Sequence, residues 1–191
     1  KVINVQFVGR LIKKSVKDIQ VKTKAMNKAK LKTFFLNLII LITIFLIDRI
    51  SKFYIIKLAE VESSVDVYVT PYLNLFLIWN KGIAFGLLSV NQSLIYNIIT
   101  VIIGLIIIFI LFMIWKNNNI QRYFLLAIAG GALGNFYDRI NYAAVPDFID
   151  LHFEGFHWFI FNVADIFITV GVLCLILVEL FYNKKIINEK N

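Results

Sequence analysis

Carboxylate and amide side chains recur at helical spacing inside or beside long apolar stretches of this chain. Asn135, Asp138 and Arg139 stand at i, i+3 and i+4, so a helix would carry them on one face. Asn162 and Asp165 are three residues apart and would share a face of another helix. Two carboxylates that lie close together can share one proton, because both cannot ionise cheaply side by side. One can then activate water while the other polarises a peptide carbonyl.

Each of these polar groups also has a purely structural explanation. Asp48 and Lys52 are four residues apart and could form a self-contained ion pair on one helix. Asp138 and its neighbour Arg139 could form an interfacial ion pair, and Asn162 and Asp165 could cap the start of the fourth helix. The sequence leaves these alternatives open for each group taken singly.

Other catalytic chemistries find little support in the residues. The chain has no Gly-x-Ser-x-Gly elbow, and Cys174 lies in an apolar run, where a thiol behaves as a small hydrophobe. His152 and His157 are five residues apart and form no His-Glu-x-x-His motif, so the sequence gives no support to zinc-dependent hydrolysis. We expect no metal and no cofactor.

The composition indicates a membrane protein. Hydrophobic residues make up 60% of the 191 residues and charged residues only 17%, compared with roughly half and a quarter in soluble domains. Apolar runs occupy residues 33–47, 93–115, 123–135 and 159–182. A helical span needs about 20 residues, and the two shorter runs continue into mixed polar sequence. We therefore predict an all-α membrane protein with four transmembrane helices.

Basic residues indicate the orientation of these spans. They precede the first run, flank the connection after the second and follow the fourth, so the positive-inside rule predicts that both termini are cytoplasmic. A rise of about 1.5 Å per residue then places Asp48, Asp138 and Asp165 about 24 to 27 Å up a hydrocarbon core of about 30 Å. Intramembrane ionisable groups mark a functional site by default, and these three would lie at one level in the outer leaflet. The net charge of +8 is then explained by basic residues that mark the cytoplasmic side of the membrane, and we expect no nucleic-acid partner.

The segments between the spans suggest further organisation. Residues 65–70 alternate apolar and polar types and residues 72–79 are strand-like, so we expect a small extracytoplasmic β-sheet within the outer loop 58–92, between the first two helices. Gly130 and Gly134 form a Gly-x-x-x-Gly step that would let the third helix approach a neighbour closely. We divide the chain into a dispensable basic extension (1–29), the membrane domain (30–183) and a basic cytoplasmic tail (184–191).

Five sequence motifs, in this order, resemble those of the bacterial lipoprotein signal peptidases (signal peptidase II), a family of aspartic proteases. The motifs are Asp-Arg-Ile-Ser-Lys at 48–52, Asn-Lys-Gly-Ile-Ala-Phe-Gly at 80–86, Gly-Gly-Ala-Leu-Gly-Asn-Phe-Tyr-Asp-Arg at 130–139, Val-Pro-Asp-Phe at 145–148 and Phe-Asn-Val-Ala-Asp at 161–165. The resemblance covers about residues 30–182. Ala143 and Pro146 depart from the family, which usually has Gly and commonly Val or Ala there, so the geometry of the loop before Asp147 is open.

The resemblance implies that Asp147 and Asp165 are the catalytic pair, although the depth of the residues did not by itself select Asp147. Asp147 must then bend back from its outer loop, and Pro146 could stiffen that bend. The residues that would support the site or bind substrate are Asp48, Lys52, Asn80, Gly82, Asn135, Asp138, Arg139 and Asn162.

The implied function is intramembrane proteolysis in the bacterial cytoplasmic (inner) membrane. The substrates would be prolipoproteins whose cysteine carries diacylglyceryl, and cleavage would occur just before that cysteine, near the extracytoplasmic face. The expected partners are these substrates and membrane lipid, with the enzyme acting as a monomer. A small transporter or channel is the alternative, because intramembrane charges also mark ion paths. A scaffold without chemistry is a third possibility.

Overall fold

The computed structural model describes residues 5–62, 64–82 and 93–190. It divides into two compact units, Lys1–Ile39 and Ile40–Asn191, each described by itself. Residues 83–86 of one expected motif, and the side chains of the whole predicted tail, lie outside the described part. The elements in chain order are α1 (Val5–Glu62), β1 (Asp66–Thr70), β2 (Leu73–Asn80), α2 (Ser93–Lys116), α3 (Gln121–Tyr142), β3 (Val145–Phe153), β4 (Phe156–His157) and α4 (Val163–Lys190).

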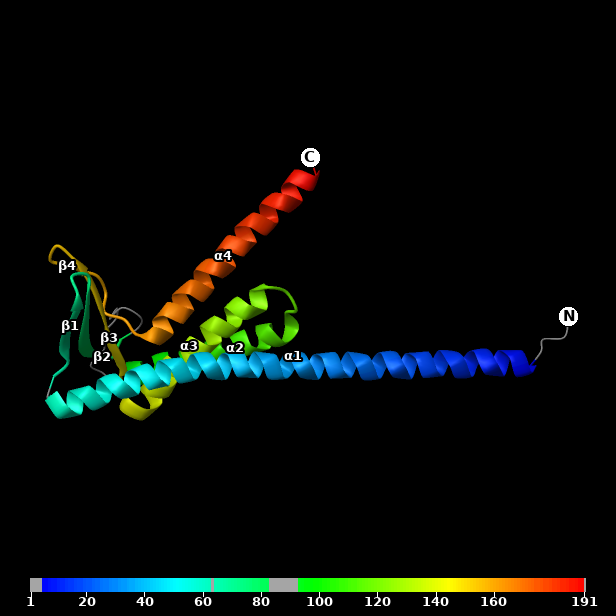
Figure 1. Ribbon diagram of the computed structural model, residues 1–191, viewed down its shortest axis with the longest axis horizontal. Helices are drawn as coiled ribbons and strands as arrows, with labels where there is room; N and C mark the ends of the chain where they lie inside the picture. Colours follow the sequence, from blue (N-terminus) through cyan, green and yellow to red (C-terminus); the bar gives the residue numbers. More distant parts are fainter. Residues whose placement is uncertain (1–4, 63, 83–92, 191) are drawn as a thin grey trace. The chain divides into compact units, whose positions relative to one another are not determined.

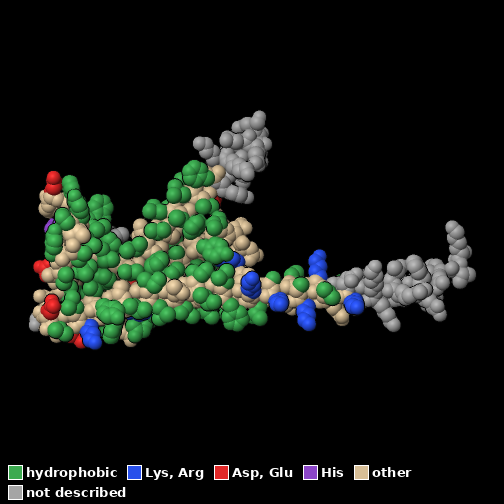
Figure 2. All heavy atoms as spheres, viewed as in Figure 1, with side chains coloured by type: hydrophobic (Ala, Val, Ile, Leu, Met, Phe, Trp, Pro, Cys, Tyr) green, Lys and Arg blue, Asp and Glu red, His purple; other side chains and the backbone are tan. Residues whose placement is uncertain are grey.

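Three helical stretches among the described residues are long and apolar enough to cross a membrane: Ile19–Glu62, Leu94–Lys116 and Val163–Phe181. They correspond to the first, second and fourth predicted spans. Helix α3 is less apolar because it carries the polar residues of the predicted site, and its role as a fourth span stays a prediction. Figure 2 shows hydrophobic side chains covering the helical part of the second unit, while its acidic side chains are visible mainly at the end that carries the sheet.

Helix α3 occupies the centre of the helical part and packs against α2 and α4. A Cβ atom at Gly130 would lie 2.8 Å from the Ile44 side chain of α1, and one at Gly134 would lie 2.4 Å from the Asp48 carboxylate. The predicted close approach along the Gly-x-x-x-Gly step is therefore confirmed, with α1 as the neighbour. This contact places the polar end of α1 directly against the polar face of α3.

The sheet has four antiparallel strands in the order β1-β2-β3-β4 (Figure 1). The two strands expected in the loop 58–92 are present as β1 and β2. The prediction that the sheet belongs to that loop alone was wrong, because β3 and β4 come from the segment between α3 and α4. Aspartate and proline are rare in strands, which is why Val145–Phe153 resembles a loop in sequence.

A small apolar cluster anchors the sheet to the end of α1. Ile55 from α1, Val65 ahead of β1 and Phe148 from β3 are buried together. Strand β3 also forms backbone hydrogen bonds with Phe161, just before α4. The sheet thus packs against the end of α1 and is hydrogen-bonded to the segment before α4, so β3 is held beside the start of α4.

Candidate active site

Asp147 and Asp165 line one cavity of about 210 Å³. Asp147 lies on β3 and Asp165 in the first turn of α4. The resemblance required Asp147 to bend back from an outer loop. It instead lies on a strand paired with β2, where Ile78 is its partner in the register. The fixed strand therefore does the positioning that the sequence analysis assigned to a stiffened bend.

Two asparagine side chains hold Asp147. Asn80 donates from Nδ2 to Oδ2 at 2.9 Å, and Asn162 donates from Nδ2 to Oδ1 at 2.6 Å. Burial, followed by the negative charge of Asp165, raises the pKa of Asp147 from 3.8 to about 6, although the two amide hydrogen bonds act in the opposite direction. This carboxylate is therefore poised to exchange a proton near neutral pH.

Asp165 is held by a different set of donors. Asn135 donates from Nδ2 to Oδ1 at 2.8 Å. The backbone N–H of Asn162 donates to Oδ2 at 3.2 Å, and the Asn162 side-chain oxygen accepts from the backbone N–H of Asp165 at 3.1 Å. This reciprocal arrangement is a capping box, so the predicted helix cap is confirmed. Because Asn162 also contacts Asp147, the cap and the carboxylate pair share one residue.

A buried cluster of four charged side chains lies next to this pair. Lys52 contacts Asp48 at 3.0 Å and Asp138 at 2.8 Å, and Arg49 contacts Asp48 at 2.7 Å and also binds Asp138. Two positive and two negative charges balance, which a buried ion cluster requires. Asp48, Asp138 and Lys52 are almost wholly inaccessible to solvent.

The observed salt bridges differ from the two ion pairs that the sequence suggested. Asp48 and Lys52 do pair, but as part of the larger cluster. Among the salt bridges of the described residues, Asp138 pairs with Arg49 and Lys52 rather than with Arg139. Sequence reasoning missed Arg49; its place beside Asp48, just after a long apolar run, was the available signal.

Hydrogen bonds connect the ion cluster to the carboxylate pair. Lys52 donates to the Asn135 side-chain oxygen at 2.7 Å, and Asn135 in turn donates to Asp165. Asp48 accepts from the backbone N–H of Ala164 at 3.0 Å, in the first turn of α4. The cluster thereby fixes the helix start that carries Asp165.

Arg139 supports the other side of the cavity through the backbone. Its Nη2 atom donates to the carbonyl oxygen of Gly82 at 2.7 Å, and the N–H of Gly82 donates to the Asn80 side-chain oxygen at 2.8 Å. Asn80 is thereby oriented to donate to Asp147. The structure thus brings together all ten residues expected at the site, although Gly82 takes part only through its main chain.

A second, larger cavity of about 600 Å³ also reaches Asp165. Most of its walls are apolar, and its lining includes Tyr72, Phe153, Phe156, Trp158, Ile166 and Val170. Asp165 therefore borders both a small polar cavity and a large apolar one. Such an arrangement can accept a reacting polar group on one side and a hydrophobic substituent on the other.

Comparison with known proteins gives one consistent result. The sequence model of the family described as Signal peptidase (SPase) II matches residues 40–181. The chain is 72% identical over 166 residues to the lipoprotein signal peptidase of Pelagibacter ubique, covering 87% of this chain and 100% of that protein. It is 42% identical over 156 residues to the lipoprotein signal peptidase of Aquifex aeolicus, covering 80% and 90%.

A solved structure also matches the fold. A bacterial membrane enzyme determined by the in meso method at 2.3 Å resolution superimposes with a TM-score of 0.62 at 30% identity. The match covers 78% of this chain and 88% of that one. The mostly helical architecture with a small antiparallel sheet is therefore that of a known membrane enzyme.

Proposed function

The chain belongs to the signal peptidase II family, and from this premise we propose that it cleaves diacylglyceryl-modified prolipoproteins just before the lipidated cysteine, with Asp147 and Asp165 as the catalytic pair. The observation that carries the assignment is that these two carboxylates border one small cavity and are held by neutral amides. The alternative of a transporter or channel finds no support among the relatives, which are lipoprotein signal peptidases.

In the proposed reaction, the two carboxylates share one proton. The ionised one removes a proton from water, and the water oxygen attacks the carbonyl carbon of the residue before the cysteine. The protonated one donates a hydrogen bond to the carbonyl oxygen as negative charge develops there. Collapse of the tetrahedral intermediate breaks the C–N bond, and a proton passes to the leaving amine of the cysteine.

The two cavities at Asp165 support a lipidated substrate. The peptide bond would lie in the polar cavity, between Asp147 and Asp165. The lipid chains on the neighbouring cysteine would then occupy the apolar cavity, whose walls include Phe153, Trp158 and Val170. The chains would enter from the bilayer, which is equally apolar, so van der Waals packing against these walls, rather than removal from water, would favour their binding.

We further propose a location and topology for the protein. The distribution of basic residues supports a multi-pass protein of the bacterial inner membrane with four spans and cytoplasmic termini. The carboxylate pair would then lie near the extracytoplasmic face, where water enters from outside and lipid enters laterally. We propose that the protein acts as a monomer and binds no nucleic acid.

The direct test is cleavage of a diacylglyceryl-modified prolipoprotein by purified protein in detergent, followed by gel mobility and mass spectrometry. We expect Asp147→Asn and Asp165→Asn each to lower the cleavage rate by about 10²-fold to 10⁴-fold, the usual contribution of acid–base catalysis. Asp66→Asn, at an exposed position of β1, is the matched control and should retain the rate. Substantial turnover by either site variant would refute the catalytic pair. Equal cleavage of substrate without the diacylglyceryl group would refute the lipid specificity.

A further inference from the structure

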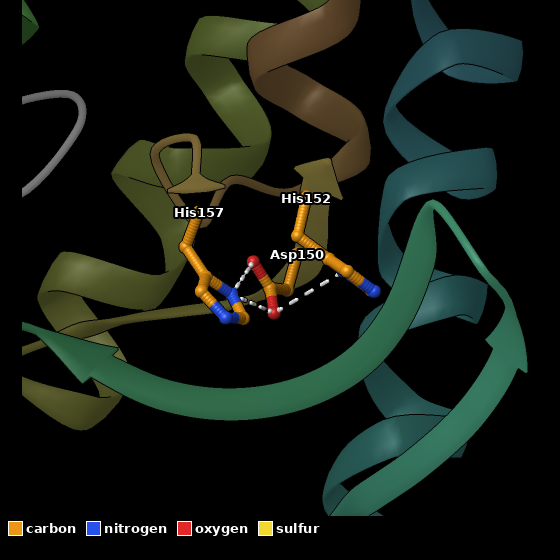
Figure 3. Close-up of side chains that lie close together, drawn as sticks. All are labelled: Asp150, His152 and His157. Atoms are coloured by element: carbon orange, nitrogen blue, oxygen red, sulfur yellow. Dashed lines mark hydrogen bonds and ion pairs between the residues drawn. The ribbon is translucent and has the colours of Figure 1, made fainter. Parts of the chain in front are cut away.

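The hairpin formed by β3 and β4 gathers three side chains that the proposed reaction does not use. Asp150 and His152 are two residues apart on β3 and project from the same face of the strand. His157 on β4 lies directly opposite His152 in the register. Figure 3 shows the two imidazoles on either side of the Asp150 carboxylate.

The hairpin turn fixes this arrangement. Glu154 and Gly155 are the two turn residues, with φ values of 48° and 83°. Positive φ at both positions is typical of a type I′ turn, which matches the twist of the paired strands. The two histidines are therefore held as a cross-strand pair, with ring centroids 5.2 Å apart and planes inclined by 26°.

The donor atoms of the three side chains converge on one point. His157 Nδ1 lies 2.9 Å from Asp150 Oδ2, and His152 Nδ1 lies 3.9 Å from the same oxygen. One ligand atom from each residue lies within 4.8 Å of the other two. Donors around a tetrahedral ion with bonds of about 2.0–2.2 Å are separated by roughly 3.4 Å, so modest rotation of side chains would complete the geometry.

One of these donor atoms is otherwise unexplained. Among the described residues, His152 Nδ1 is buried and has no hydrogen-bond partner. A hydrogen bond between Asp150 and His157 would by itself explain only that pair and would leave this buried nitrogen without a hydrogen bond, which is unfavourable. Coordination of a cation would use all three donors.

Contrary to the expectation from the sequence that the protein holds no metal, we propose that Asp150, His152 and His157 bind one divalent transition-metal ion of the zinc class. Two imidazole nitrogens and one carboxylate oxygen suit Zn²⁺, whereas Mg²⁺ prefers oxygen ligands alone. The half-exposed His157 leaves the site open to solvent, so that water can take the fourth position.

This site is structural rather than hydrolytic. His152, Phe153 and Phe156 from the same hairpin line the large apolar cavity that reaches Asp165. An ion that joins β3 to β4 stiffens this wall of the cavity. The spacing of the histidines gives no support to a hydrolytic zinc motif, and the proposal does not involve Asp147 or Asp165.

The chain is well suited to a test because it has only two histidines. Full-length protein purified in detergent with a tag that contains no histidine would be treated with chelator, dialysed and titrated with ZnCl₂ by calorimetry. We expect one equivalent to bind, while MgCl₂ produces no heat. His152→Ala and His157→Ala should each weaken the binding of Zn²⁺ by at least about tenfold, and Asp147→Asn, a matched control outside the cluster, should leave it unchanged.

A measurement on the unmodified protein keeps the proposal testable if a histidine variant fails to fold. In a ¹H–¹⁵N correlation NMR spectrum of the imidazole rings, the resonances of both histidines should shift as Zn²⁺ is added. Both shifts should reach their limit at one equivalent of Zn²⁺. The apparent melting temperature should rise over the same range, because an ion that binds only the folded state stabilises it. The proposal would be overturned by a dissociation constant for Zn²⁺ above about 100 µM, or by imidazole resonances that do not move. Loss of Zn²⁺ binding in Asp147→Asn would also overturn it.

Discussion

Two groups of buried aspartates lie side by side in this protein, and they differ in their partners. Asp48 and Asp138 form salt bridges with Arg49 and Lys52. Asp147, by contrast, accepts hydrogen bonds from neutral asparagine amides, as Asp165 does. Among the described residues, no lysine or arginine forms a salt bridge with that second pair.

The difference teaches which carboxylates can do proton chemistry. The negative charges of the first group are balanced by two cations, as a buried ion cluster requires. A buried carboxylate that is bound only by amides keeps its charge at a cost, and its pKa rises towards the range in which protons transfer easily. Burial is common to both groups, so the partners decide the role.

Removing a cation from the first group should have the largest effect on stability. Lys52→Met leaves Asp48 and Asp138 buried with only Arg49 for compensation. Breaking a buried ion cluster in this way typically costs 3–5 kcal/mol, so we expect little folded protein. Fluorescence-detected size-exclusion chromatography after heating would measure the loss.

The double variant Lys52→Met with Asp138→Asn is the control for charge balance. It removes one charge of each sign and should recover part of the lost stability, although the hydrogen bond from Lys52 to Asn135 is still missing. If the double variant melts no higher than the single one, charge neutrality is not what holds the cluster together.

Removing a charge from the second group should increase the stability of the folded protein instead of lowering it. Burial raises the pKa of Asp147 to about 6 from 3.8 in the folded protein, so the folded form binds the proton more tightly than the unfolded form does. Stability is therefore lost as the pH rises from about 4 to about 6, by up to about 3 kcal/mol. Asp147→Asn should remove this penalty, and its apparent melting temperature should exceed that of the unmodified protein at pH 7.5.

The pH dependence separates this effect from any change in packing. The difference between Asp147→Asn and the unmodified protein should shrink towards pH 4, where the native carboxyl is also neutral. Asp66→Asn, at an exposed position, should show no comparable pH-dependent gain. A constant difference across this pH range would mean that the charge of Asp147 costs the fold nothing.

This contrast also shows how far the sequence could lead. Spacing placed Asn135, Asp138 and Arg139 on one helical face, and the apolar runs predicted four spans, because both follow from local helical geometry. Three of these spans are present as helices long and apolar enough to cross a membrane. Spacing did not reveal that Asp138 would turn to Arg49 and Lys52 instead of Arg139. That choice depends on how α1 and α3 pack, which is a long-range contact.

Strand β3 is the other part that sequence reasoning missed. Asp147, Asp150 and Pro146 lower its strand propensity, so Val145–Phe153 looked like a loop. Pairing with β2 and contact with Phe161 override that local preference. The position of Asp147 therefore came only from the resemblance to a family, and the hairpin sequence Glu154-Gly155 was the one local signal of a strand pair.

A smaller loss should follow from disturbing the contact between α1 and α3 without changing any charge. A Cβ atom at Gly134 would lie 2.4 Å from Asp48 Oδ2, so Gly134→Ala must displace that carboxylate. Overpacking of this kind typically costs 1–3 kcal/mol. Because Asp48 also holds the first turn of α4, we expect cleavage to slow as well as stability to fall.

Gly104→Ala on α2 is the matched control. A Cβ atom there would approach only the end of the Phe136 ring, at 3.2 Å, and the ring can shift. Its melting temperature and cleavage rate should stay close to those of the unmodified protein. Equal losses from both substitutions would show that helix packing in general, rather than the position of Asp48, is sensitive.

The smallest effect should come from deleting residues 1–25, because both groups of aspartates belong to the second unit. In the second unit, α1 contributes Ile40 and Leu41 to the apolar core, and the ion cluster begins at Asp48. The shortened protein keeps Lys28, Lys30 and Lys32, which are enough to mark the cytoplasmic side of the first span. We expect its cleavage rate to lie within about twofold of the full chain, because the carboxylate pair and the cluster that supports it are unchanged.

Replacing those three lysines by glutamine in the shortened protein should instead reduce the amount inserted in the correct orientation, as measured by protease protection in vesicles. Loss of cleavage on deletion alone, with insertion intact, would mean that the extension contributes to the site.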